Sequence, residues 1–248
     1  MRLRPLVALL LLVGSGAAGA ADLVVSAASS LTDAFQAVGK AYETKHPGTH
    51  VVLNFAASDV LLRQIASGAP ADVFASADET AMDKAVAAKA IDPATRQDFA
   101  SNRLVLIVPK GGQAHVTSPA DLKSDAVKRV AYGDPASVPV GRYTKSALEQ
   151  QGLWEAVSAK GVLAQNVRQS LDYVARGEVD AGFVFATDAT IMKDKVDVAA
   201  IVATPKPITY PIAVVTGSKQ AKEAVMFEAF VQSPEGRGIL AGFGFQAP

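Results

Sequence analysis

Cysteine is absent from the 248 residues, and only three histidines are present. Without cysteine the chain has no thiolate nucleophile, no disulfide and no sulfur ligand for zinc or an iron–sulfur cluster. With His46, His50 and His115 as its only imidazoles, we expect no metal-ion site and no cofactor. A chain of this length buries enough apolar surface to fold without disulfides, so the absence of cysteine is compatible with an exported protein.

The sequence also lacks an excess of charge of either sign, because 24 lysines and arginines balance 24 aspartates and glutamates. A nucleic-acid-binding domain needs a basic face, and a peripheral membrane anchor needs a cluster of basic residues. We therefore expect no nucleic-acid partner. An anionic ligand, if the chain binds one, must be held by local geometry and not by the overall charge.

A long apolar run occurs only at the N-terminus, where Leu6–Val13 is unbroken. Two arginines precede this run, and the small residues Ala18–Ala20 follow it. The pattern is typical of a secretory signal peptide, and the run is shorter than the roughly 20 apolar residues that span a bilayer. We expect residues 1–20 to be a signal peptide cleaved near Ala20. The mature protein would then be periplasmic and monomeric, with a formal net charge of −2.

Short β-rich segments alternate with amphipathic helical segments along the rest of the chain, which is typical of an α/β fold with largely parallel sheets. We expect strands at Leu23–Ala27, Val51–Phe55, Asp72–Ser76, Leu104–Val108, Val130–Tyr132, Ala181–Phe185, Val196–Val202 and Ile208–Val215. These elements are too many for one small sheet and too few for two independent domains in tandem.

Two lobes joined by two crossing strands fit this number of elements. The candidate crossings lie near Arg103–Val108 and Tyr210–Val215. Lobe I is then predicted at residues 22–103 plus 213–248, and lobe II at residues 104–212. Each lobe would hold a mixed, mostly parallel sheet flanked by helices.

Serines follow the first two predicted strands, where the chain turns into a helix. Ser30 and Ser58 each lie at or beside a helix start. The first amides of a helix have no acceptor within it, and the helix N-terminus carries a partial positive charge. Two such helix ends at the carboxyl edge of a sheet form an anion site, to which each serine adds a hydroxyl donor. Helix capping explains the serines as well, so the pattern alone leaves both interpretations open.

Two predicted helix starts in the second lobe present backbone amides in a similar way. Pro139 has no N–H, so the usable amides of its helix are those of Val140 and Gly141. Val167 begins a further helix. Either start is ordinary when taken alone.

Several segments carry, in order along the chain, a resemblance to a known family. They are Ser26–Thr32, Asn54–Ser58, Arg63–Asp78, Ala94–Gln97, Gly133–Pro135, Val138–Gly141 and Tyr210–Val215. In them the chain resembles the periplasmic molybdate-binding proteins of molybdate ABC importers, over essentially its whole mature length. The resemblance implies a type II-like periplasmic binding protein fold. It also implies that molybdate or tungstate is captured between the lobes and delivered to the membrane permease of an ABC importer, without catalysis.

In that family, hydroxyls and backbone amides bind the oxyanion without oppositely charged side chains. Position by position, the resemblance assigns Ser30 and Ser58 as hydroxyl and amide donors from the first lobe. It assigns the amides of Val140 and Val167 as donors from the second. The remaining family position, usually a tyrosine whose hydroxyl reaches the anion, is Phe185 in this chain.

Phe185 is therefore one departure from the family pattern, and it removes a donor. Asp59 is another, because the family usually has a small or hydroxyl residue directly after the second serine. As an early helical residue Asp59 suits the helix dipole, but its carboxylate must point away from a bound anion.

Two alternatives remain beside the molybdate interpretation. A site of donors only also accepts another dianion such as sulfate, from which molybdate would differ by size. A hydrolase is the alternative from another class, and it would need a base beside a nucleophile. No Gly-x-Ser-x-Gly sequence occurs, and none of the histidines ends a convincing strand.

Overall fold

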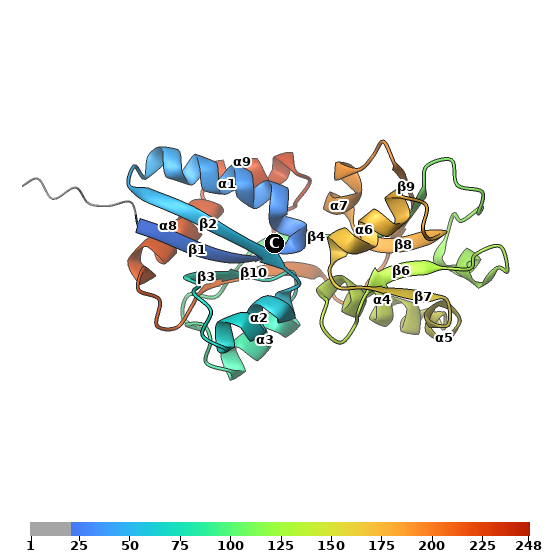
Figure 1. The fold of residues 1–248 in the computed structure, drawn as a ribbon, viewed down its shortest axis with the longest axis horizontal. Helices are drawn as coiled ribbons and strands as arrows, with labels where there is room; N and C mark the ends of the chain where they lie inside the picture. The colour runs from blue at the N-terminus through green and yellow to red at the C-terminus, as the bar shows by residue number, and fades with distance from the viewer. Residues whose placement is uncertain (1–20) are drawn as a thin grey trace, which may run out of the picture.

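The structure, a computed structural model, describes residues 21–248, which form two lobes side by side along the longest axis of the molecule (Figure 1). Each lobe contains a five-stranded sheet with helices on both faces. The predicted two-lobed α/β architecture is therefore confirmed. The predicted signal peptide, residues 1–20, lies outside the described residues. Within residues 21–248, no helix combines the length and the apolar character needed to cross a membrane.

The first lobe is built on a sheet with the strand order β2-β1-β3-β10-β4. In that order the strands are Thr49–Ala56, Ala21–Ala28, Val73–Ala75, Ile208–Val214 and Gln97–Asn102. One face is covered by the 3-10 turn η1 and helices α1, α8 and α9, which span Ser29–Leu31, Thr32–Lys45, Ala221–Gln232 and Pro234–Gly242 (Figure 1). The other face is covered by α2 and α3, at Ser58–Ala66 and Glu79–Ala87.

The second lobe is built on a sheet with the order β7-β6-β8-β5-β9. In that order the strands are Gly161–Ala164, Val130–Gly133, Ala181–Phe185, Leu104–Pro109 and Val196–Val202. Helices α6 and α7, at Val167–Ala175 and Ala186–Ile191, lie on one face, and α4 and α5, at Pro139–Gln150 and Trp154–Ser158, on the other (Figure 1). A 3-10 turn, η2, spans Pro119–Lys123.

Both sheets follow the same plan. The first three strands of each are parallel, and the fourth is antiparallel to both of its neighbours. That fourth strand is β5 in one sheet and β10 in the other. Each is the strand that the chain forms directly after crossing between the lobes, at Arg103 and at residues 203–207. After each crossing, the chain thus forms the antiparallel fourth strand of the sheet that it enters.

The predicted boundary between residues 212 and 213 lies inside β10, all of which belongs to the first sheet. The boundary at 212 is therefore wrong, and the chain returns to the first lobe before Ile208. Pro211, within β10, occupies a β-bulge where the register shifts between Tyr210 and Pro211. A bulge tolerates proline because one residue there is left out of the ladder of hydrogen bonds.

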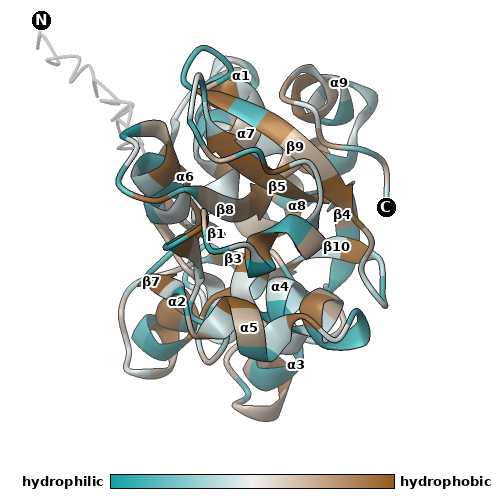
Figure 2. Ribbon diagram, turned by 90° about the vertical axis from the view of Figure 1, so that its right-hand side faces the viewer, coloured by the Kyte–Doolittle hydropathy of each residue, from teal (hydrophilic) through white to brown (hydrophobic). Residues whose placement is uncertain are grey.

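The central strands could be predicted from the sequence because they are buried on both faces. In β5 the four successive residues Leu104–Ile107 are all buried, as expected for a strand covered by helices on both sides. Figure 2 shows the same strand in the brown of apolar residues. By contrast, β4 and β7 were not expected from the sequence. Both are edge strands; β4 is rich in polar residues and β7 is only four residues long, so neither is marked by a long apolar or alternating run.

Candidate anion-binding site

Residues at or just beyond the carboxyl ends of six parallel strands, three from each sheet, line one small cavity between the lobes. The volume open to the centre of a water-sized molecule in this cavity is about 10 Å³. Its lining consists of Ala28, Ser29, Ser30, Ala57, Ser58, Ala77, Val138, Pro139, Val140, Val167 and Phe185. All five residues named from the sequence, Ser30, Ser58, Val140, Val167 and Phe185, are therefore brought together. Each is buried, so the lobes are closed around this space.

The hydroxyl of Ser58 is held from behind by a neighbouring backbone amide. Ser58 is the first residue of α2, and the N-cap is Ala57, whose side chain accepts no hydrogen bond. The N–H of Ala77 donates to Ser58 Oγ at 3.1 Å. This bond uses one of the two lone pairs of the oxygen, and the hydroxyl hydrogen remains available to an acceptor in the cavity.

The hydroxyl of Ser30 also has a partner on the side away from the cavity. Ser30 lies in η1, and its Oγ is 3.0 Å from the hydroxyl of Tyr210, which is fully buried. Burial, reinforced by the Asp188 carboxylate, raises the pKa of Tyr210 well above its usual value, so this hydroxyl stays protonated. Among residues 21–248, neither serine hydroxyl caps its own helix, and the capping interpretation is wrong for both.

Two glycines allow the N-terminus of α4 to approach the end of β6. A Cβ at Gly141 would lie 1.9 Å from the carbonyl oxygen of Gly133, so only glycine permits this contact. The N–H of Gly141 donates to the carbonyl of Val138 at 3.0 Å. The expectation that Gly141 supplies a second usable amide is therefore wrong, and Val140, at the second position of the helix, remains the candidate donor.

The N-terminus of α6 is fixed by a side-chain cap. Asn166 is the N-cap residue, and its Oδ1 accepts from the N–H of Gln169 at 3.0 Å. Val167, the next residue, lines the cavity as the first residue of the helix. Its amide is thus one of those without an acceptor inside the helix, as the sequence suggested.

Phe185 ends β8 and lines the cavity, where it offers no polar atom. Its ring packs edge to face against Tyr210, with the ring centroids 5.7 Å apart, and against Tyr143 at 6.2 Å. The tyrosine expected at this position from the family pattern is therefore replaced by an apolar wall supported by two other tyrosines.

Two arginines join the lobes next to the candidate amide donors. Arg142, in α4, places Nη2 2.6 Å from Asp59 Oδ2 and Nε 2.7 Å from Asp78 Oδ2, both in the first lobe. The Asp59 carboxylate also contacts Lys84 Nζ at 2.6 Å. Asp59 therefore faces cations outside the cavity lining, which explains how a carboxylate is tolerated directly after Ser58.

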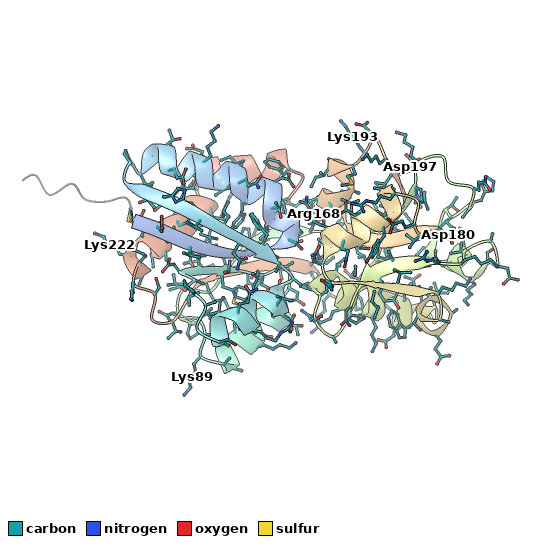
Figure 3. The ribbon with its side chains drawn as sticks, viewed as in Figure 1. Lys89, Arg168, Asp180, Lys193, Asp197 and Lys222 are labelled. Atoms are coloured by element: carbon teal, nitrogen blue, oxygen red, sulfur yellow. The ribbon has the colours of Figure 1, made fainter. Side chains whose placement is uncertain are left out.

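Arg168 forms the corresponding link between α6 and α1, and Figure 3 shows it at the junction of the lobes. Its Nη2 is 2.7 Å from Asp33 Oδ2 in the first lobe, and its Nε is 2.6 Å from Asp188 Oδ1 in its own lobe. Burial raises the pKa of Asp188 to about 6, although the charge of Arg168 opposes this rise. Both arginines are thus committed to carboxylates, and neither is part of the cavity lining.

Within residues 21–248, neither serine has a base beside it that could turn its hydroxyl into a nucleophile. In residues 21–248 their hydroxyls contact a tyrosine hydroxyl and a backbone N–H, whereas an activated serine needs a proton acceptor such as histidine. Within the same residues, no three His, Asp or Glu side chains come together so that they could hold a metal ion. The arrangement offers hydrogen-bond donors to a small anion.

Comparison with known proteins places this geometry in a family. The family described as bacterial extracellular solute-binding protein matches residues 23–246. The molybdate-binding protein ModA of Escherichia coli is 39% identical over 239 residues, which cover 94% of this chain and 91% of that protein. The solved periplasmic molybdate-binding protein of Azotobacter vinelandii superposes with a TM-score of 0.76 at 24% identity, covering 91% of this chain and 99% of that one. The predicted periplasmic binding protein fold is confirmed.

The same fold also occurs in a protein for another anion. The sulfate-binding protein SubI of Mycobacterium tuberculosis superposes with a TM-score of 0.79 at 19% identity, covering 92% of this chain and 87% of that one. At this identity the likeness concerns the fold alone. The choice of anion must therefore be argued from the lining of the cavity.

Replacing Phe185 by tyrosine tests whether the cavity wall lacks a hydrogen-bond donor at this position. We expect Phe185→Tyr to tighten the binding of molybdate, the ligand implied by the sequence resemblance, by about 0.5–2 kcal/mol, the value of a charge-assisted bond less that of a displaced water. Phe183→Tyr is the control, because Phe183 lies on the same strand, is fully buried and does not line the cavity. Titration calorimetry and melting temperatures would be measured; unchanged affinity with lower stability in Phe185→Tyr contradicts the prediction.

Replacing Asp33 by asparagine tests the link made by Arg168. The substitution keeps the shape and removes the charge that holds Arg168 to the first lobe, so the closed form and molybdate binding should weaken. Because the pair is partly exposed, the loss should be about 1 kcal/mol or less, a factor of up to about five. Asp83→Asn is the control, since Asp83 pairs with Arg96 inside the first lobe. Equal losses of affinity in the two variants would remove Arg168–Asp33 from lobe closure.

Proposed function

Because the chain belongs to the bacterial extracellular solute-binding protein family, we propose that it captures molybdate or tungstate between its lobes and delivers the anion to the permease of an ABC importer. The observation that carries the proposal is a cavity whose lining includes hydroxyl and backbone N–H donors and no charged side chain. Two serine hydroxyls, each with a hydrogen-bond partner on the side away from the cavity, meet there with the first amides of helices from both lobes. The molybdate-binding relative in Escherichia coli, at 39% identity, supports the choice of anion.

The protonation state of the ligand follows from the donors. A fully deprotonated tetrahedral dianion accepts hydrogen bonds at every oxygen, which suits such a lining. Hydrogen phosphate keeps a proton at neutral pH and would leave it without an acceptor, an arrangement that is costly when buried. The site should therefore reject phosphate because of its proton, whereas it must reject sulfate because of its smaller size.

The size of the cavity is set by rigid parts of the backbone. Helix ends α2, α4 and α6 carry donors that cannot move independently of the sheets on which they pack. A smaller anion such as sulfate cannot reach donors from both lobes at ideal distance unless the lobes close further. Sulfate remains the alternative ligand, and a titration with both anions decides between the two.

The cellular setting of the proposal follows from the family and the N-terminus. Members of this family are bacterial extracellular proteins, and the pattern of residues 1–20 is that of a signal peptide. We propose export to the periplasm with cleavage near Ala20, action as a monomer, and no catalysis. The anion-bound closed form would be the one that the permease receives.

The ligand preference is tested on the purified mature chain. We expect tight binding of molybdate and tungstate, with sulfate at least about a hundredfold weaker, a gap of roughly 2.7 kcal/mol. Phosphate should bind more weakly still, because of its proton. Isothermal titration calorimetry with the four anions measures this directly. Comparable affinities for sulfate and molybdate would defeat the size argument.

The two serines are tested by removing their hydroxyls. Ser30→Ala and Ser58→Ala each delete a hydrogen bond to a charged ligand, so molybdate affinity should fall by about one to two orders of magnitude, or 1.5–3 kcal/mol. Binding should not vanish, because the backbone amides remain. Ser218→Ala is the matched control, since its hydroxyl binds Asp72 at the other end of the strands. If both cavity variants bind molybdate as tightly as the parent does, the two serines have no role in binding the anion.

A further inference from the structure

A buried chain of polar side chains runs behind the cavity and ends on Ser30. The Tyr210 hydroxyl, in β10, lies 3.0 Å from Ser30 Oγ, and the Asn102 amide Nδ2, at the end of β4, lies 3.3 Å from the Tyr210 oxygen. All three side chains are buried, but of the three only Ser30 lines the cavity. The two residues behind it were not found from the sequence as part of the site.

The direction of each hydrogen bond in this series of side chains is set by Asn102, at the end remote from Ser30. The N–H of Arg103 donates to Asn102 Oδ1 at 2.9 Å, which fixes the amide so that Nδ2 points the other way. Nδ2 then donates to Thr187 Oγ1 at 2.9 Å and to the Tyr210 oxygen. An amide nitrogen cannot accept, so the hydrogen of Tyr210 must go elsewhere. In residues 21–248, Ser30 Oγ is the acceptor within its reach.

The consequence for Ser30 is that its oxygen is occupied on the side away from the ligand. With Tyr210 donating to one lone pair of Ser30 Oγ, the Ser30 hydrogen cannot point back at Tyr210 and is kept on the cavity side. Without this bond, the hydrogen could turn away from the cavity and leave only lone pairs facing it, which would accept a hydrogen bond from an anion such as hydrogen phosphate. Ser58 needs no such side chain, because a backbone N–H, that of Ala77, fills the same place behind it.

We propose that Tyr210 is a positioning residue that keeps the Ser30 hydrogen directed into the cavity, and so favours a fully deprotonated oxyanion as the ligand of the site. The inference rests on the proposed function. The ring of Phe185 packs on that of Tyr210 and helps to hold it in place.

Tyr210→Phe is the first test, because it keeps the ring and removes the hydroxyl. Molybdate affinity should fall about three- to tenfold, less than on loss of the Ser30 hydroxyl itself. The ratio of molybdate affinity to phosphate affinity should fall as well, since the Ser30 hydrogen is then free to turn away from the cavity; a merely structural role would not change this ratio. Tyr42→Phe is the control, because the Tyr42 hydroxyl binds Glu223 in the first lobe, outside the cavity.

The double variant decides whether Tyr210 acts through Ser30. If it does, Tyr210→Phe should have no further effect on molybdate affinity in a Ser30→Ala background. Losses that simply multiply would overturn the inference, as would parent-like affinity and anion preference in Tyr210→Phe. If the parent binds neither molybdate nor tungstate, the proposed function fails and takes this inference with it. If the parent binds and the losses multiply, only the role of Tyr210 fails.

A second variant covers the case in which Tyr210→Phe does not fold. In Asn102→Asp a carboxylate replaces the donor and draws the Tyr210 hydrogen to itself, so Ser30 loses its partner. Ser30→Ala should then cost less affinity in the Asn102→Asp background than in the parent. The new carboxylate repels the anion equally in Asn102→Asp and in Asn102→Asp with Ser30→Ala, so this repulsion cancels when the two are compared. An unchanged cost of Ser30→Ala would contradict the inference.

Discussion

Taking a doubly charged anion out of water without a counter-charge is the constraint on which this structure depends. The desolvation cost of such an ion is large, and it is offset only when the anion oxygens accept hydrogen bonds from donors that are already in place. Donors that must first reorient would lose much of this benefit. The architecture therefore has to bring many fixed N–H and O–H groups to one small cavity and to close it.

The fold meets this requirement by ending six parallel strands at one place. Two sheets of the same topology contribute three strand ends each, and the helices that follow present their first amides there. The helix ends are held by close contacts, such as that between Gly141 and Gly133, and by the side-chain cap at Asn166. The donors are thus fixed to whole lobes, so we expect ligand binding and lobe closure to occur together.

Positive charge is kept out of the cavity although it lies nearby. Arg142 and Arg168 follow the candidate donors Val140 and Val167 closely in the chain, yet each guanidinium binds two carboxylates and joins the lobes. Full neutralisation of the anion by an arginine would favour any anion of suitable charge. Neutral donors of fixed direction discriminate instead by protonation state and size, which are the properties that separate the candidate ligands.

The sequence by itself determined the order of strands and helices and therefore which residues stand at strand ends. Buried strands such as β5 carry continuous apolar runs, and the strand–serine–helix pattern marks Ser30 and Ser58. Helix starts pointed to Val140 and Val167, and the resemblance assigned them as donors and added Phe185. Strand β4 escaped notice because most of its residues are polar. Only the tertiary structure decided that β10 belongs wholly to the first sheet and which way the serine hydroxyls point. Tyr210 lies 180 positions from Ser30, and the direction of a hydroxyl depends on its partners in space, which packing brings together and local sequence does not encode.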